Sequence, residues 1–309
     1  MRAWQPSDMA GVTGTEYLDS TAVDGLAAVA EGVTPVILWT AKRPGGGTAT
    51  AARAFRDDFR PYLGTVNGKQ SVYFDTATRQ LNLDTTNLPA GRGDKFWFIA
   101  TKNMETRGGD FYPFGYGGGS GTAVTWKMRQ GQVPYSDVGS VGFNVGSAPI
   151  ATTGISIITE TYRQVGTLSR SWYNGQAQPS TYTRERNTSA SNAKLGHWPT
   201  YGNGAHQHLL RLGWGYGEPS ADDILRLQGW LSWDTGDNGA SLPADHPYKT
   251  AAPMVSEGEA SLIAGTAAPA LANIAATGTA ALRIVATAAI TLGAVGSTSE
   301  ARAQIAAQA

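Results

Sequence analysis

The chain has one abrupt break in composition, and this break constrains its fold more than any other feature. All 9 Trp, 12 Tyr and 8 Phe of its 309 residues lie at or before Tyr248, and so do all 4 His. Protein cores are packed as densely as organic crystals, so large side chains are needed to fill the space between layers. Residues 1–250 therefore have the side chains to build a domain, whereas the residues beyond them do not.

The remainder of the chain divides into a linker and a tail of small residues. Prolines punctuate the connection, and we assign 251–258 as a Pro-containing linker and 259–309 as an Ala/Thr/Gly-rich repeat tail. The tail buries too little apolar surface to offset the entropy of ordering it. Two interpretations follow. The tail is a flexible low-complexity linker, or it is a β-rich segment that serves particle attachment or oligomerisation. A trimer is the favoured oligomer. The repeats of the tail read Gly265-Thr266-Ala267-Ala268, Gly278-Thr279-Ala280-Ala281 and Ala286-Thr287-Ala288-Ala289.

Charge and cysteine content exclude several classes of protein. The 24 basic and 24 acidic residues give a net charge of zero. This argues against a protein that binds nucleic acid or an anionic membrane mainly through positive charge. Without cysteine there is no disulfide and no thiolate metal site. The uncharged stretch 261–282 is made of Ala, Thr and Gly rather than Leu, Ile and Phe, so no membrane insertion is expected. No signal peptide is visible at 1–10, which predicts synthesis in the cytoplasm.

The first 250 residues predict an all-β fold. Short apolar or alternating runs bounded by turn residues recur along them, as at 36–39, 71–75, 80–83, 96–99 and 168–173. Many short strands with frequent turns are typical of a jelly-roll sandwich. One short helix is expected near 220–233, because Ser220 and Asp223 form a capping-box pattern before an amphipathic run.

Three stretches resemble the concanavalin A-like (laminin G-like) lectin domain of virion proteins from tailed bacteriophages and phage-derived particles. The resemblance covers residues 1 to about 250, and its closing helix with the Leu-Pro-Ala-Asp-His-Pro-Tyr motif is the most specific part. The Ala/Thr/Gly tail lies outside that family but resembles repeats of phage structural proteins. The stretches are 60–75, Ser171-Trp172-Tyr173-Asn174-Gly175, and 218–233 followed by 242–248.

This resemblance implies a concanavalin A-like jelly roll that is made in the bacterial cytoplasm and displayed on a virion surface. The expected protein is a non-enzymatic structural or adhesion protein of the tail-fibre, spike or head-fibre type. Its domain would bind a host polysaccharide, and residues 259–309 would hold other virion proteins. A purely structural decoration protein without a ligand is an alternative, and a polysaccharide-degrading glycosidase or lyase on the same fold is another.

Aromatic side chains in predicted loops are the candidate carbohydrate-binding residues. Pyranose rings stack on exposed Trp and Tyr, while Asn and Asp bind hydroxyl groups; the competing interpretation is that these rings fill the core. The candidates are Tyr112, Tyr116, Tyr135, Asp137, Trp198, Tyr201 and Asn203.

Two patterns offer metal ligands, and no other cofactor is expected. Asp234, Asp237 and Asn238 bring oxygen ligands to a turn that suits calcium, although an ordinary Asx-rich turn has the same composition. His206 and His208 share one face of a strand, so three pairs around a trimer axis would ligate a transition metal; otherwise they form a polar strand edge.

The sequence contains no pattern that is specific to catalysis. It has no Gly-x-Ser-x-Gly elbow, and no strand carries the paired carboxyl groups that glycoside hydrolysis requires. We therefore expect the protein not to be an enzyme.

Overall fold

The computed structural model describes fifteen stretches of the chain. Contacts divide the chain into two units, Trp4–Pro253 and a second unit that joins Met1–Ala3 to Met254–Ala309. No helix of the described part is long and apolar enough to cross a membrane. The described residues are 1–25, 35–43, 50–54, 56–76, 78–103, 111–117, 123–128, 134–138, 141–144, 154–179, 181–183, 187–197, 206–255, 283–285 and 304–306.

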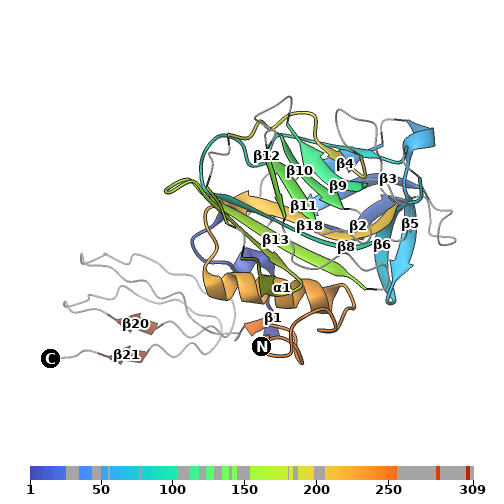
Figure 1. The fold of residues 1–309 in the computed structure, drawn as a ribbon. Helices are drawn as coiled ribbons and strands as arrows, with labels where there is room; N and C mark the ends of the chain where they lie inside the picture. Colours follow the sequence, from blue (N-terminus) through green and yellow to red (C-terminus); the bar gives the residue numbers. More distant parts are fainter. Residues whose placement is uncertain are drawn as a thin grey trace, which may run out of the picture. The chain divides into compact units, whose positions relative to one another are not determined.

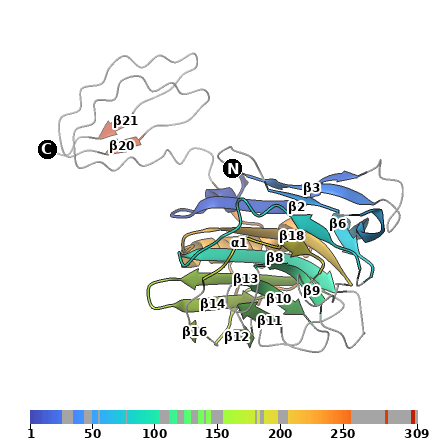
Figure 2. The same ribbon diagram turned by 90° about the horizontal axis from the view of Figure 1, so that it is seen from above.

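Trp4–Pro253 is an all-β sandwich, as the sequence predicts, and its two layers face each other (Figures 1 and 2). The strands of the first layer pair antiparallel in the order β14 (Leu168–Tyr173), β13 (Ser156–Arg163), β8 (Lys95–Asn103), β18 (Gln207–Tyr216), β2 (Thr13–Gly25) and β3 (Val36–Lys42). The hairpin of β5 (Tyr62–Val66) and β6 (Lys69–Phe74) pairs with β18, while β15 (Gln176–Ala177) and β16 (Tyr182–Thr183) pair with β14.

The second layer continues from β3 without a break in the hydrogen bonding. Its antiparallel order is β4 (Ala51–Arg53), β7 (Leu81–Leu83), β17 (Lys194–Leu195), β9 (Phe111–Tyr116), β10 (Val124–Met128), β11 (Tyr135–Val138) and β12 (Val141–Asn144). Two single 3-10 turns, at Pro6–Asp8 and Asp57–Phe59, complete the described elements of this unit apart from its helix.

Aromatic side chains fill the space between the layers. Trp39, Trp97, Trp126 and Trp214 are all fully buried there, and the Phe114 ring of β9 stacks on Trp214 of β18 with centroids 6.2 Å apart. Burying rings of this size supplies most of the apolar area that stabilises such a core. The concentration of aromatic residues before Tyr248 is thus explained by the packing of two sheets.

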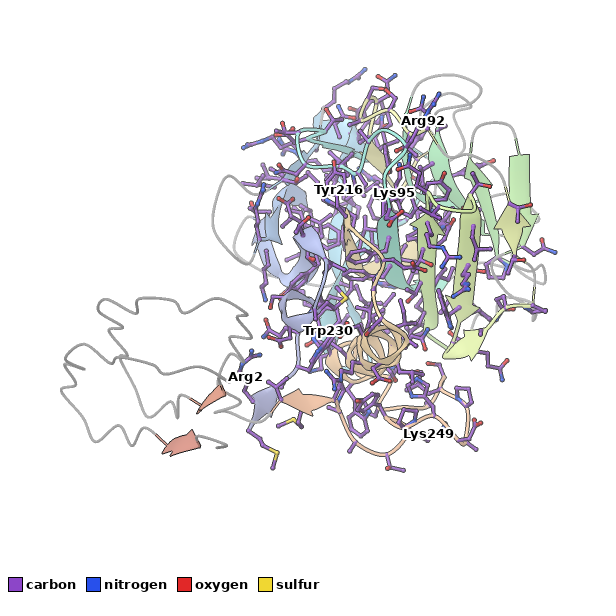
Figure 3. The ribbon with its side chains drawn as sticks, turned by 90° about the vertical axis from the view of Figure 1, so that its left-hand side faces the viewer. Arg2, Arg92, Lys95, Tyr216, Trp230 and Lys249 are labelled. Atoms are coloured by element: carbon purple, nitrogen blue, oxygen red, sulfur yellow. The ribbon has the colours of Figure 1, made fainter. Side chains whose placement is uncertain are left out.

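Helix α1 (Ala221–Asp234) covers the outer face of the first layer over β13 and β8 (Figure 1). Its N-terminus is capped as predicted, because the Ser220 Oγ accepts a hydrogen bond of 3.1 Å from the Asp223 backbone N–H. Trp230, labelled in Figure 3, packs edge-on against Tyr17 and Phe98 of the sheet.

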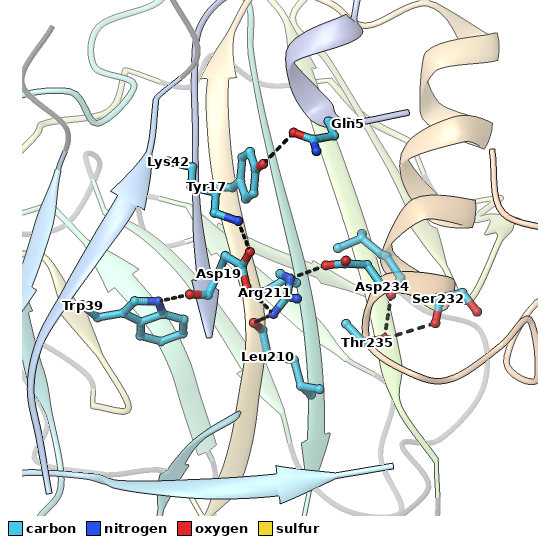
Figure 4. Close-up of polar contacts among 11 residues, drawn as sticks. Gln5, Tyr17, Asp19, Trp39, Lys42, Leu210, Arg211, Ser232, Asp234 and Thr235 are labelled. Carbon is cyan, nitrogen blue, oxygen red and sulfur yellow. Dashed lines mark hydrogen bonds and ion pairs between the residues drawn. The ribbon is translucent and has the colours of Figure 1, made fainter. Parts of the chain in front are cut away.

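A buried arginine joins this helix to the sheet (Figure 4). Arg211 of β18 is 2 % exposed; its Nε lies 2.6 Å from Asp234 Oδ2 and its Nη1 lies 3.0 Å from Asp19 Oδ1. Lys42 also pairs with Asp19. Burial, aided by the charges of Asp19 and Asp234, raises the pKa of the neighbouring Tyr17 phenol to about 12.

A buried lysine, Lys95, anchors the first residue of β8 (Figure 3). Lys95 is fully buried, and its ammonium donates to Thr188 Oγ1 at 2.9 Å and to the Gly91 carbonyl, and lies over the Tyr162 ring. Carbonyl and hydroxyl acceptors of this kind satisfy a buried ammonium group. The lysine therefore ties the 187–191 segment to the first layer.

The second unit contains two pairs of short strands within its described residues. β1 (Arg2–Ala3) pairs antiparallel with β19 (Met254–Val255), and β20 (Arg283–Val285) pairs parallel with β21 (Gln304–Ala306). Most of the predicted linker and tail lies outside the described residues, and its role in attachment or oligomerisation stays a prediction.

Candidate functional site

The described part of the second layer contains a polar pocket of about 400 Å3. This volume lies in the range of about 300–1,000 Å3 that is usual for small-molecule sites. Five of its seven lining residues carry amide, hydroxyl or ammonium groups, and the other two are small or aliphatic. The lining residues are Gln80, Asn82, Leu83, Thr85, Asn192, Ala193 and Lys194.

Strand alternation places the polar residues of the pocket. Leu81 and Leu83 of β7 are buried in the core, so the intervening Asn82 points to the opposite face and is exposed. Asn82 lies directly across from Lys194 of β17, and the Leu83 backbone N–H donates to the Ala193 carbonyl at 2.9 Å. β7 and β17 lie between β4 and β9 in the pairing order, and both of these neighbours are labelled in Figure 1.

Gln80 is the most constrained polar residue of the pocket. Its side chain is only 9 % exposed, and its backbone N–H donates to the Phe59 carbonyl at 2.9 Å. The preceding Arg79 bonds to Asp75 Oδ1 at 2.9 Å and to the Tyr62 hydroxyl at 2.7 Å. These contacts hold the segment before β7 in place, so the Gln80 backbone is fixed while its side-chain amide is free to turn.

The Gln80 side-chain carbonyl has no partner in the described part of the chain. Its Oε1 is buried and accepts no hydrogen bond there. An unpaired buried acceptor costs about 1–3 kcal/mol, and other buried side-chain atoms of the described part, such as Gln178 Oε1, share this state. The terminal torsion of glutamine is broad and turns easily, which lets Oε1 swing toward a donor inside the pocket.

An Asx turn fixes the far rim of the pocket at Thr85. The Asp84 Oδ1 accepts hydrogen bonds from the Thr86 N–H at 2.9 Å and from its hydroxyl at 2.7 Å. These bonds favour the charged carboxylate and hold the pKa of Asp84 below its usual value. Asp84 itself does not line the pocket.

The structure places the predicted carbohydrate-binding residues differently from the prediction. Residues 111–116 form strand β9 and not a loop, and the prediction for Tyr116 is wrong because its ring is fully buried. The Tyr116 hydroxyl accepts from Trp97 Nε1 at 3.0 Å and donates to the Pro89 carbonyl at 2.8 Å. Burial raises the pKa of this phenol, as expected for a core tyrosine.

The other predicted carbohydrate residues do not come together as a described site. Tyr112 is half-buried on β9. Tyr135 and Asp137 lie on β11, but their side chains fall outside the described part. Trp198, Tyr201 and Asn203 lie outside the described residues altogether.

The predicted calcium ligands serve the end of α1 instead. Asp234 pairs with Arg211, while Asp237 Oδ2 accepts from the hydroxyls of Ser232 and Ser241 at 2.6 and 2.7 Å. Asn238 adopts a left-handed conformation with φ 52°. The segment is therefore an Asx-rich turn, which was the competing interpretation.

The two histidines predicted to bind a metal as a pair have different environments in the structure. His208 is buried, its Nδ1 lies 2.8 Å from Ser71 Oγ, and its ring stacks on Tyr73 with centroids 4.4 Å apart. His206 lies just before β18 and is half-buried. No group of three or more potential metal-ligating residues occurs among the described residues.

The pocket residues themselves were missed by the sequence analysis. The alternation of Leu81 and Leu83 indicated that Asn82 faces away from the core. Nothing local, however, indicates that residues 192–194 pair with residues 81–83, more than a hundred positions earlier. Only the register of β7 and β17 brings these polar groups together.

Comparison with known proteins identifies no family for this chain. No family model matches the chain, and no curated protein matches it. Solved structures similar to it include a Trypanosoma rangeli sialidase in complex with sialic acid, at 11% identity and TM-score 0.48, over 73% of this chain and 33% of the sialidase. A GH54 α-L-arabinofuranosidase aligns at 12% identity and TM-score 0.49, over 76% of this chain and 60% of that one. An arabinofuranosidase complexed with arabinofuranosyl-α-1,2-xylobiose aligns at 13% identity and TM-score 0.47, with the same coverage.

These matches correct the expectation that the chain is not an enzyme. The solved structures it resembles are glycosidases, so the fold does not separate this chain from enzymes. The chain spans about a third of the sialidase and 60% of the arabinofuranosidases. With identities of 11–13% and TM-scores below 0.5, these likenesses assign neither an activity nor a substrate to this chain.

Proposed function

We propose that the Trp4–Pro253 domain binds carbohydrate in the pocket over β7 and β17. The observation that carries this proposal is the lining of the pocket, where the side chains of Gln80, Asn82, Asn192, Thr85 and Lys194 lie beside Leu83 and Ala193. The unpaired Oε1 of Gln80 is itself buried, and it meets a ligand in the pocket only when the side-chain amide turns. A sugar hydroxyl that donates to this oxygen would satisfy it. A hydrogen bond to an acceptor that was unpaired contributes favourably to the free energy of binding.

The mixture of groups in the pocket suits a polyhydroxylated ligand. Each sugar hydroxyl both donates and accepts, and the amides of Asn82 and Asn192 offer both functions side by side. Thr85 adds a hydroxyl, and Lys194 adds three donors. An apolar ligand would leave all of these groups unpaired at a cost in free energy.

We also propose that this binding serves attachment of a phage particle to its host. The support is the sequence resemblance to phage lectin-like domains, whose motif residues take structural roles here. Asn174 and Gly175 form the turn between β14 and β15 with positive φ. An added Cβ at Gly175 would lie 2.7 Å from Pro243 Cδ, so the hairpin motif packs on the Leu-Pro motif that closes the domain.

The test compares substitutions at two glutamines, each of which has a buried Oε1 without a hydrogen-bond partner in the described part of the chain. Gln80→Leu removes the unpaired acceptor from the pocket, whereas Gln178→Leu removes a buried, unpaired Oε1 that does not line it. Wild type and both variants are titrated with the strongest binders from a glycan array. Gln80→Leu should lower affinity about tenfold, or about 1.4 kcal/mol, and Gln178→Leu should leave it unchanged.

Two outcomes would refute the proposal. One is an array without any binder; the other is equal loss of affinity in both variants, which would point to general destabilisation. The same incubations are assayed for new reducing ends, which reveals cleavage if the bound glycan is also hydrolysed.

A further inference from the structure

We infer that the pocket selects anionic saccharides, whose carboxylate or sulfate is held between Lys194 and Arg53. This inference rests on the proposed function and names the class of sugar that the site takes. Its basis is a row of three residues across neighbouring strands. Asn82 of β7 lies opposite Lys194 of β17 on one side and opposite Arg53 of β4 on the other.

The register places both cations close to the centre of this row. Residues directly opposite each other in antiparallel strands have Cβ atoms about 5 Å apart and point to the same face of the sheet. Asn82 and Arg53 are exposed and Lys194 is half-buried, so all three are on the face away from the core. Both cationic side chains are long enough to reach an anion that sits above Asn82.

Among the residues that the structure describes, no acid neutralises the two cations. No Asp or Glu lines the pocket. The adjacent carboxylate of Asp84 is engaged by the N–H and hydroxyl of Thr86. Within the described ranges, neither Lys194 nor Arg53 has an ion pair or a side-chain hydrogen bond, although the chain as a whole carries no net charge. Unpaired cations beside amide groups form a natural receptor for an anionic sugar, because charge-assisted hydrogen bonds are the strong ones.

The experiment separates charge from the rest of the sugar. Each acidic oligosaccharide that binds on the array is compared with its carboxyl-reduced or desulfated form. Wild type should prefer the acidic form about tenfold or more, which is about 1.4 kcal/mol. The preference should shrink between 0.1 M and 1 M salt, where the Debye length falls from about 10 Å to about 3 Å.

Single substitutions assign this preference to the two cations. Lys194→Gln should lower affinity for the acidic form about tenfold and affinity for the neutral form by a clearly smaller factor, because a glutamine amide still donates hydrogen bonds to hydroxyl groups. Arg53→Gln should act in the same direction. Lys194→Arg keeps the charge and should retain the preference. Arg170→Gln removes an exposed cation from β14 in the other layer and should change neither affinity.

The outcomes distinguish this inference from the proposed function. Equal affinity for acidic and neutral forms, or equal effects of Lys194→Gln on both, would overturn the inference while leaving carbohydrate binding intact. An array on which no saccharide binds would overturn both. A thermal melt of each variant identifies any loss that comes from unfolding.

Discussion

Removing the buried Arg211 side chain should destabilise the domain severely. Arg211 joins two carboxylates from different elements, Asp19 on β2 and Asp234 at the end of α1. An acid in the last turn of a helix is disfavoured by the helix dipole, so Asp234 depends on this arginine more than a surface acid would. Arg211→Met keeps most of the aliphatic stem and removes the guanidinium group, including its hydrogen bond to the Leu210 carbonyl.

The structure sets the size of the expected effect. Breaking a buried ion pair by removing one partner costs about 3–5 kcal/mol, because the other charge is left without compensation. Here the side chain of Asp234 is 35% exposed and Asp19 retains Lys42, which is itself 46% exposed. Water and lysine therefore offset part of the penalty, and we expect a loss of about 3 kcal/mol, at the lower end of that range.

Urea unfolding of the full chain, followed by tryptophan fluorescence, measures this loss. A fall of 3 kcal/mol is a large share of the about 5–15 kcal/mol that is usual for a domain. Asp234→Asn should cost about 1 kcal/mol, because the carboxylate it removes is partly solvated and its partner keeps Asp19. The reasoning is refuted if Arg211→Met unfolds within 1 kcal/mol of wild type, or if Asp234→Asn is the more damaging change.

Two further predictions concern His246, in the Leu-Pro motif that closes the domain, and Gly196, which follows β17. Burial lowers the pKa of His246, so the unfolded chain takes up a proton more readily than the folded one; stability should be full above about pH 6.5 and fall below it. Urea midpoints at pH 7.5 and 5 should show this fall in wild type and a smaller one in His246→Asn, and equal falls would contradict it. Gly196→Ala should cost about 1–3 kcal/mol and weaken saccharide binding, because its Cβ would lie 2.1 Å from Phe74 Cδ1 at φ +73°, next to β17. Gly93→Ala, with open space around its Cβ, is the control in both thermal melts and glycan titrations, and a similar loss there would contradict the steric argument.

The sequence by itself determined the features that depend on neighbours along the chain. The loss of aromatic side chains after Tyr248 marks where a dense core is no longer possible. The alternation around Leu81 and Leu83 indicated a strand, and Ser220 with Asp223 indicated the start of α1, because capping and alternation act over two to four residues. The all-β class followed from the number of such short segments.

Only the tertiary structure decided the roles of individual polar and aromatic residues. Tyr116 was predicted to lie in a loop, yet its ring is buried and its hydroxyl finds partners inside the core. Asp234 looked like a calcium ligand until Arg211, more than twenty positions earlier, proved to be its partner. The pocket depends on the pairing of Asn82 with Lys194. The physical reason is the same in each case: these roles depend on strand register over long sequence separations, which no local pattern encodes.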